Sequence, residues 1–154
     1  MIRKITKNEL PALFEIFKDN IKNPWSFEGL CDFFEDETHV FLGCFKGNVL
    51  AGYAIYSTII DEGEILSIAT SKGFKRQGIA TLLLNEIFDS TKKAGVCRLL
   101  LEVRMENNIA RTFYEKNNFK TIGTRADYYH NPTDDAIIMQ RITDYSVLSR
   151  ISYP

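Results

Sequence analysis

Cysteine and histidine are scarce in this sequence of 154 residues, which contains three cysteines and two histidines. Cys31, Cys44 and Cys97 are widely spaced and form no metal-type pair, and His39 and His130 stand apart from each other. This spacing gives little support to a metal site, so we expect no metal. An odd number of separated cysteines is typical of free, buried thiols in a reducing cytoplasm rather than of a disulfide framework.

The sequence also lacks a long apolar segment and an excess of charge of one sign. No run of about 18 apolar residues is present, so we expect no membrane span. The first residues, MIRKITKNEL, turn polar too early for a signal peptide, which favours a cytoplasmic protein. The net charge of −1 provides no overall basic field, so we expect no direct binding to nucleic acid.

What the chain does have is enough apolar residues for a core. At 154 residues, of which 45% are hydrophobic, it is long enough for one domain and not obviously for two. No internal repeat, low-complexity tract or linker is present. We therefore expect one mixed α/β domain over residues 1–142, followed by a C-terminal tail over residues 143–154 that has no clear periodicity.

Apolar patterns and turn residues predict the order of the strands and helices. Asn8 is a candidate N-cap for the first helix and Ser26 for the second, and further helices begin near residues 78 and 107. A loop is expected over residues 125–135. Strands are expected at residues 2–5, 38–45, 49–60, 64–70, 97–103, 119–123 and 136–142.

The stretch 64–88 organises the rest of the chain. Residues 64–70 are typical of a buried strand, a short basic loop with a glycine follows, and helical spacing of apolar residues begins after Gly78. A helix start carries unpaired N–H groups and the positive end of the helix dipole, and Gly78 and Ala80 leave room there for a phosphate. An ordinary strand-to-helix connection with solvated lysines explains the same residues about equally well.

The sequence has neither the glycine-lysine-serine/threonine ending of a P-loop nor the three-glycine fingerprint of a dinucleotide fold. Its loop instead resembles the pyrophosphate-binding signature of GNAT acetyltransferases, Gln/Arg-x-x-Gly-x-Gly/Ala. Gly78 and Ala80 match this pattern, and Lys75 departs from it at the first position. Asn118 departs from a glycine that is common in the family. We expect a left-handed conformation there, which asparagine adopts best after glycine.

Three polar residues outside the loop suit acyl transfer. Glu102 ends an apolar strand, where it fits either a proton acceptor at a cleft or an ion pair with Arg104 or Arg98 at the sheet surface. Tyr114 lies on the apolar side of its helix. Simple packing explains that position, although its phenol is also able to protonate a leaving thiolate. Asn107 is a candidate N-cap and a candidate cofactor contact.

Longer segments extend the resemblance to the ribosomal-protein-alanine N-acetyltransferases of the RimI type. They are NPWSFE, DEGEILSIAT, LLLEVRMENNIARTFYEKNNF and ADYYHNPTDDAIIM. The resemblance implies that Glu102 is the proton acceptor, that Tyr114 is the proton donor and that acetyl-CoA is the co-substrate. The cofactor contacts that it implies are Ile68, Ala69, Thr70, Arg76, Gln77, Gly78, Ile79, Ala80, Thr81 and Asn107.

The fold implied by the resemblance is the GNAT α/β fold, a central mixed, twisted sheet of about six or seven strands with a splayed middle and helices on both faces. The implied reaction is direct acetyl transfer, in a ternary complex, to the N-terminal amine of a protein. The substrate would be the N-terminal segment, typically beginning with alanine, of small-subunit ribosomal protein eighteen, and the enzyme a monomer or weak dimer.

Trp25 and the segment 125–135 are expected to form the peptide groove. Two alternatives stay open. One is an acetyltransferase for a small-molecule amine or antibiotic, and the other is a non-catalytic coenzyme A-binding module.

Overall fold

The computed structural model describes residues 1–22, 24–144 and 146. Of the tail expected from residue 143, residues 145 and 147–154 lie outside the described part. The described strands are β1 (Ile2–Lys4), β2 (His39–Lys46), β3 (Val49–Ile59), β4 (Glu62–Thr70), β5 (Arg98–Arg104), β6 (Lys120–Tyr129) and β7 (Asp134–Ile142). The helices are α1 (Leu10–Asn20), α2 (Phe27–Glu35), α3 (Ile79–Lys93) and α4 (Asn108–Lys116), with short 3₁₀ turns η1 (Lys7–Glu9) and η2 (Lys72–Phe74).

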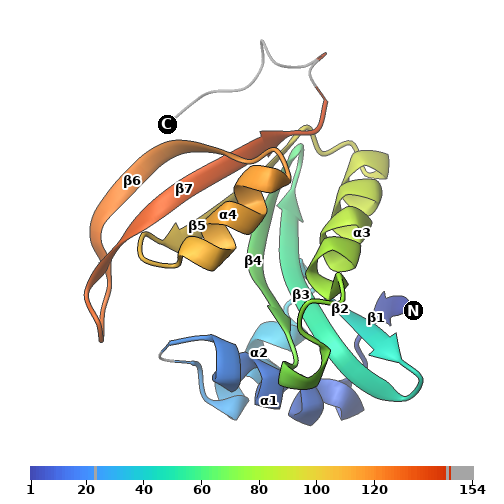
Figure 1. Ribbon diagram of the computed structural model, residues 1–154. Coiled ribbons are helices and arrows are strands. Elements are labelled where there is room, and N and C mark those ends of the chain that lie inside the picture. Colours follow the sequence, from blue (N-terminus) through green and yellow to red (C-terminus); the bar gives the residue numbers. More distant parts are fainter. Residues whose placement is uncertain (23, 145, 147–154) are drawn as a thin grey trace.

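Within the described residues, the strands form one mixed sheet in the order β1-β2-β3-β4-β5-β7-β6, and helices cover both of its faces (Figure 1). α1 and α2 bury Leu13 and Leu30 in one cluster with Tyr53 of β3. α3 buries Leu83 in a second cluster on the opposite face, together with Leu99 of β5. Each fully buried leucine contributes roughly 1.5–3 kcal/mol relative to an exposed one, so the two apolar layers hold the sheet between them.

The parallel strands β4 and β5 separate after a short ladder. Their pairing runs from Glu62 opposite Arg98 to Ile65 opposite Leu101. β4 then continues to Thr70 and β5 to Arg104, and these extensions do not pair with each other. In Figure 1, β4 continues toward α1 while β5 turns toward the β6–β7 hairpin. The splayed middle of the expected fold is therefore confirmed.

A buried arginine holds the closed end of this parallel pair. Arg98 is only 8% exposed, and its Nε donates to Glu62 Oε1 at 2.7 Å. Its Nη1 donates to Gln140 Oε1 of β7 at 3.3 Å. These bonds link β4, β5 and β7 at the end of the parallel pair opposite to the point of divergence.

A β-bulge in β4 marks the point of divergence. Ser67 lies opposite Ile55 of β3, but Ile65 lies opposite Tyr56, so Leu66 is an extra residue on β4. A bulge bends its strand and increases the local twist. The bulge therefore turns β4 away from β5 at the residue where their ladder stops.

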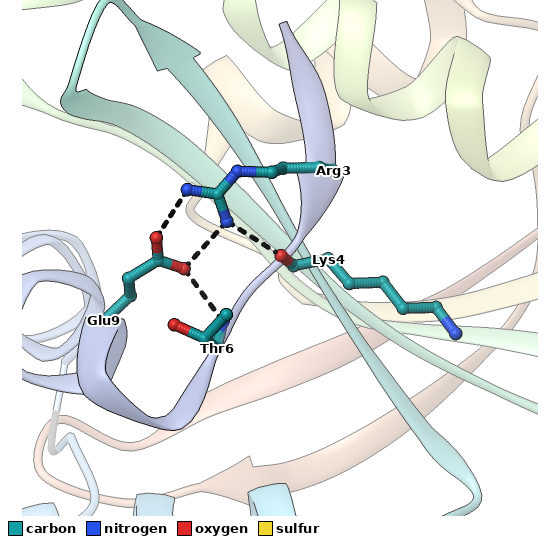
Figure 2. A network of polar contacts seen from close by, with 4 residues as sticks. All are labelled: Arg3, Lys4, Thr6 and Glu9. Atoms are coloured by element: carbon teal, nitrogen blue, oxygen red, sulfur yellow. Dashed lines mark hydrogen bonds and ion pairs between the residues drawn. The ribbon is translucent and has the colours of Figure 1, made fainter.

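The prediction that Asn8 caps the first helix is wrong. Asn8 lies inside the 3₁₀ turn η1, and α1 begins at Leu10. The carboxylate of Glu9 organises this corner instead, since it accepts from the backbone N–H of Thr6 at 2.8 Å and from the guanidinium of Arg3 at 2.5 and 3.0 Å (Figure 2). A carboxylate accepts this N–H and the guanidinium together, which an asparagine side chain does less strongly.

The loop expected over residues 125–135 is also wrong. β6 continues to Tyr129 and β7 begins at Asp134, which leaves only residues 130–133 as the connection. β6 is the edge strand, and its residues 124–128 are exposed, so it lacks the apolar alternation by which a strand is recognised.

Two other local expectations are confirmed. Ser26 caps α2, since its Oγ accepts from the N–H of Gly29 at 3.0 Å. Asn118 has φ of +67°, the left-handed conformation that ends α4. None of the described helices combines the length and the apolar character needed to cross a membrane.

Candidate functional site

A cleft of about 280 Å³ opens where β4 and β5 separate. Its wall combines the end of α1, the bulged part of β4, the free end of β5, one side of α4 and the end of β6. The lining residues are Asn20, Ile21, Lys22, Leu66, Ser67, Ile68, Glu102, Val103, Arg104, Asn107, Ala110, Tyr114 and Tyr129.

Glu102 and Tyr114 reach this cleft from opposite faces of the sheet. Leu101 and Val103 belong to the core beneath α3 and α4, so Glu102 between them points to the other face. Tyr114 belongs to α4 and to the core cluster of that same helical face. Both side chains line one cleft because the separated strands leave an opening through the sheet.

The phenol of Tyr114 is held in an aromatic environment. Its ring packs edge-on against Phe113 at 5.3 Å and Phe119 at 5.4 Å between ring centres. Burial raises the pKa of Tyr114 above its ordinary value. Within the part of the chain that the structure describes, the phenol has no hydrogen-bond partner. It is therefore protonated at neutral pH and able to donate into the cleft.

Glu102 forms an ion pair with Arg125 of β6, whose Nε lies 3.3 Å from Glu102 Oε1. The pairs that the sequence suggested, with Arg98 or Arg104, are both wrong. Arg98 binds Glu62, as described above. Arg104 donates to the carbonyl oxygens of Pro132 at 2.8 Å and of His130 at 3.3 Å.

Further acidic and phenolic groups surround Glu102. Glu64 of β4 lies opposite Leu100 of β5, and Leu100 is two residues before Glu102 on β5. Burial raises the pKa of Glu64, and the charge of Glu102 adds to that shift. The charge of Glu102 also raises the pKa of Tyr128, and burial raises that of Tyr129 to about 12 with Glu102 as the next cause. This field favours a cation beside Glu102.

Sequence reasoning singled out neither Glu64 nor Arg125. Glu64 lies within the segment DEGEILSIAT and Arg125 begins the segment 125–135, but the sequence gave neither residue a role in the chemistry. Only the alternation of charged residues along β4 hinted that Glu64 shares a face with Glu62.

Of the expected cofactor contacts, Ile68 and Asn107 line the cleft. Asn107 is the N-cap of α4, since its Oδ1 accepts from the N–H of Ala110 at 3.1 Å. Ala69 is buried in the core beneath α1 and α2, so its side chain points away from the cleft. The carbonyl oxygen of Thr70 accepts from Asn20 Nδ2 at 3.4 Å.

The remaining expected contacts, Arg76 to Thr81, lie at the start of α3 and outside the lining of the cleft. Gly78 is the N-cap with φ of +77°, and the first helical hydrogen bond joins the N–H of Leu82 to its carbonyl oxygen at 3.0 Å. The N–H groups of Ile79, Ala80 and Thr81 therefore precede the hydrogen-bonded part of the helix.

Side chains leave that helix start open. Ile79 is buried in the core, whereas Arg76, Gln77 and Thr81 are exposed. Lys75, at the first position of the signature, donates from Nζ to Asn20 Oδ1 at 3.0 Å. The arrangement offers backbone donors, the positive helix end and the Arg76 charge to an anion.

The sequence profile of the Acetyltransferase (GNAT) family matches residues 8–119. The chain belongs to this family. It is therefore an acyltransferase enzyme, and the GNAT fold predicted from its sequence is confirmed.

Individual GNAT relatives match over nearly the whole chain. The [ribosomal protein bS18]-alanine N-acetyltransferase of Haemophilus influenzae is 33% identical over 142 residues, which cover 90% of this chain and 96% of that protein. The solved ribosomal-protein-S18-alanine N-acetyltransferase of Escherichia coli has a TM-score of 0.86 at 29% identity, covering 94% of both chains. An N-acetyltransferase of Thermoplasma acidophilum, solved with coenzyme A, has a TM-score of 0.73 at 23% identity over 92% of this chain and 98% of that one.

Proposed function

We propose that this GNAT enzyme transfers the acetyl group of acetyl-CoA to the N-terminal α-amine of a protein, by direct attack in a ternary complex. The observation that carries the proposal is the single cleft in which Glu102 and Tyr114 meet at the splay of β4 and β5. The names of the relatives support the N-terminal alanine of ribosomal protein bS18 as the substrate. The reaction would then take place in the cytoplasm, where ribosomes are made.

Glu102 is the proton acceptor in this proposal. A peptide α-amino group has a pKa of about 8, so it is mostly an ammonium ion at neutral pH and cannot attack a carbonyl. The carboxylate of Glu102, with Glu64 nearby, attracts this ammonium ion and accepts one of its protons. The neutral nitrogen then attacks the carbonyl carbon of the thioester.

Tyr114 is the proton donor. As the carbon–sulfur bond breaks, the departing thiolate of coenzyme A takes the proton of the phenol. The second proton that the attacking nitrogen loses restores the phenol through solvent. Glu102 passes its proton to water after the acetylated peptide leaves, so one proton is released in each turnover.

The donor substrate would be held by backbone groups of β4 and α3. Beyond Ile65, the edge of β4 that faces away from β3 is not paired with β5, so its peptide groups, apart from the Thr70 carbonyl that Asn20 contacts, would bind the amides of the pantetheine arm. Ile68, Ala69 and Thr70 contribute through the backbone. The N–H groups at the start of α3, with Arg76 and Gln77, would hold the pyrophosphate, and Asn107 a further polar group of the cofactor.

The test is mass spectrometry of acetyl transfer to three acceptors. These are a peptide that copies the N-terminus of bS18, the same peptide with a blocked α-amine and a free lysine, and a polyamine mixture. Each is incubated with acetyl-CoA and wild type, Glu102→Gln or Tyr114→Phe. The exposed Glu37 supplies a matched control, Glu37→Gln, because it lies outside the cleft.

We expect acetylation of the free α-amine alone and a loss of about 10²–10⁴-fold in kcat/KM for Glu102→Gln, with no change for Glu37→Gln. Preference for polyamines would move the substrate to small amines, and equal rates for Glu102→Gln would remove that residue from its role. Binding of acetyl-CoA without turnover on any amine would indicate the non-catalytic module.

A further inference from the structure

We propose that Arg125 is a resident cation of the acceptor site. Its guanidinium occupies the place beside Glu102 that the ammonium group of the substrate takes, and it moves onto the ring of Tyr128 when the substrate enters. This inference rests on the proposed function, because it assigns Glu102 the role of ammonium site. Arg125 is then a positioning residue that competes with the substrate and yields to it.

The ion pair between Arg125 and Glu102 is weak enough for an ammonium group to replace the guanidinium. The Nε–Oε1 distance is 3.3 Å, and the side chains are 55% and 23% exposed. Water screens the charges of so exposed a pair, and its net stabilisation is small. An ammonium group that enters on a peptide with further contacts is therefore able to displace the guanidinium.

Tyr128 offers the displaced guanidinium a second place. The Arg125 guanidinium carbon already lies 5.4 Å from the centre of the Tyr128 ring, within the range of a cation–π contact. Both residues belong to β6. A small rotation of the Arg125 side chain toward this ring frees the carboxylate and keeps the cation stabilised.

The β6 backbone that carries Arg125 and Tyr128 is held in place by its contacts with β7. Arg125 lies opposite Ala136 and Tyr129 opposite Asp134, so β6 holds three intervening residues where β7 holds one. Within this bulge Asp127 has φ of +50°, and its N–H donates to Asp135 Oδ1 at 2.8 Å. The exchange is therefore a motion of the Arg125 side chain and not of the strand.

Arg104, the arginine that lines the cleft, is not available for this role. Arg104 is held by two backbone carbonyl oxygens, of Pro132 and His130, and its guanidinium lies over the ring of Tyr129 at 4.5 Å. Among the described residues, the groups that interact electrostatically with Glu102 include Glu64 from β4 and Arg125, Tyr128 and Tyr129 from β6, while Lys22 lines the same cleft. Within the described part of the chain, Arg125 is the cation that forms an ion pair with Glu102.

The return of Arg125 also helps Glu102 to lose its proton after each reaction. When Glu102 has taken a proton from the amine, its neutral acid attracts neither the product nor Arg125. After the product leaves, the returning guanidinium favours the ionised carboxylate, and the proton passes to water. The ion pair of the substrate-free enzyme is restored without any further reactant.

The first experiment is NMR of the Arg125 guanidinium carbon in the full chain, assigned by its loss in Arg125→Gln. Titration with n-butylammonium should shift this signal, whereas n-butanol should not. In Glu102→Gln, n-butylammonium should leave it unchanged. A signal that does not respond to n-butylammonium in wild type overturns the inference, whether or not any peptide is acetylated. Absence of acetyl transfer with a responding signal overturns the proposed function alone.

The second experiment is the steady-state kinetics of the acceptor peptide. Arg125→Gln should lower KM for the peptide about two- to fivefold without raising kcat, the size expected for one exposed ion pair. Arg125→Lys should restore the wild-type KM. Lys120→Gln removes a charge from the exposed start of the same strand and should change neither constant. A higher KM for Arg125→Gln would mean that Arg125 binds the substrate, and would overturn the inference.

Discussion

The phenol oxygen of Tyr53 lies 2.8 Å from the hydroxyl oxygen of Ser67, directly beside the cleft. Tyr53 is completely buried in the core under α1 and α2, whereas Ser67 lines the cleft and follows the bulged residue Leu66. This hydrogen bond therefore fastens the bulge of β4 to the core. Burial raises the pKa of Tyr53, so the phenol is protonated at neutral pH and either hydroxyl is able to donate the bond.

Removal of this bond should loosen β4 at the cleft. Tyr53→Phe should lower the free energy of unfolding by about 1 kcal/mol, the usual contribution of one hydrogen bond, and should weaken acetyl-CoA binding. Urea unfolding and calorimetric titration measure the two effects. Because both side chains act through one bond, adding Ser67→Ala to Tyr53→Phe should lower the free energy of unfolding only slightly further. Additive losses would show that the bond has no such role.

Gly78→Ala should lower the free energy of unfolding, whereas Gly73→Ala should not. A Cβ at either position meets no atom within 4 Å, but Gly78 has φ of +77° and Gly73 lies outside the left-handed region. Alanine in a left-handed conformation costs roughly 1–2 kcal/mol. We expect thermal unfolding at a temperature lower by several degrees for Gly78→Ala alone.

The same pair of variants tests the anion site at α3. The Cβ of Gly78→Ala would stand beside the N–H groups that we propose to hold the pyrophosphate, so coenzyme A affinity should fall more for Gly78→Ala than for Gly73→Ala. Equal affinities in calorimetric titration would argue against this helix start as the pyrophosphate site.

Glu62→Gln should destabilise the closed end of the splayed pair. The variant leaves the buried guanidinium of Arg98 without its charged partner, although Gln140 still accepts one bond. Since the Glu62 side chain is itself partly exposed, we expect a loss of about 1–2 kcal/mol in the free energy of unfolding. Glu37→Gln, an exposed control, should be neutral in the same urea titration.

Glu9 should contribute to the pH dependence of stability. The hydrogen-bonded guanidinium of Arg3 is the main cause that lowers the pKa of Glu9 from 4.5 to about 2. A depressed pKa in the folded state means stabilisation that is present above pH 4.5 and is lost as the pH falls through 2.

Unfolding by urea at several pH values checks this dependence. Wild type should exceed Glu9→Gln in stability at neutral pH by a small amount, because water screens this exposed pair, and the difference should vanish near pH 2. A difference that is independent of pH would assign the effect to packing rather than to charge.

Local patterns in the sequence were sufficient for most elements, for the caps at Ser26 and Asn107, and for the left-handed Asn118, which are all confirmed by the geometry. These features depend on the dihedral preferences and hydrogen bonds of residues close together in the chain. The GNAT fold was also predictable, because several motifs of one family occur in order over most of the chain. Edge strand β6 was missed beyond residue 123 because its exposed residues show no alternation.

Tertiary structure alone decided what surrounds Glu102. The sequence nominated Glu102 and Tyr114, but their common cleft exists because β4 and β5 separate where the Leu66 bulge begins. Arg125 reaches Glu102 because β7 lies between β5 and β6, and the sheet order brings together charges that are 23 positions apart. Such pairings depend on strand order and register, which no short stretch of residues encodes. Short sequence motifs were therefore sufficient to predict Glu102 and Tyr114 as the catalytic residues. Only the long-range packing of the strands determined that Arg125 pairs with Glu102.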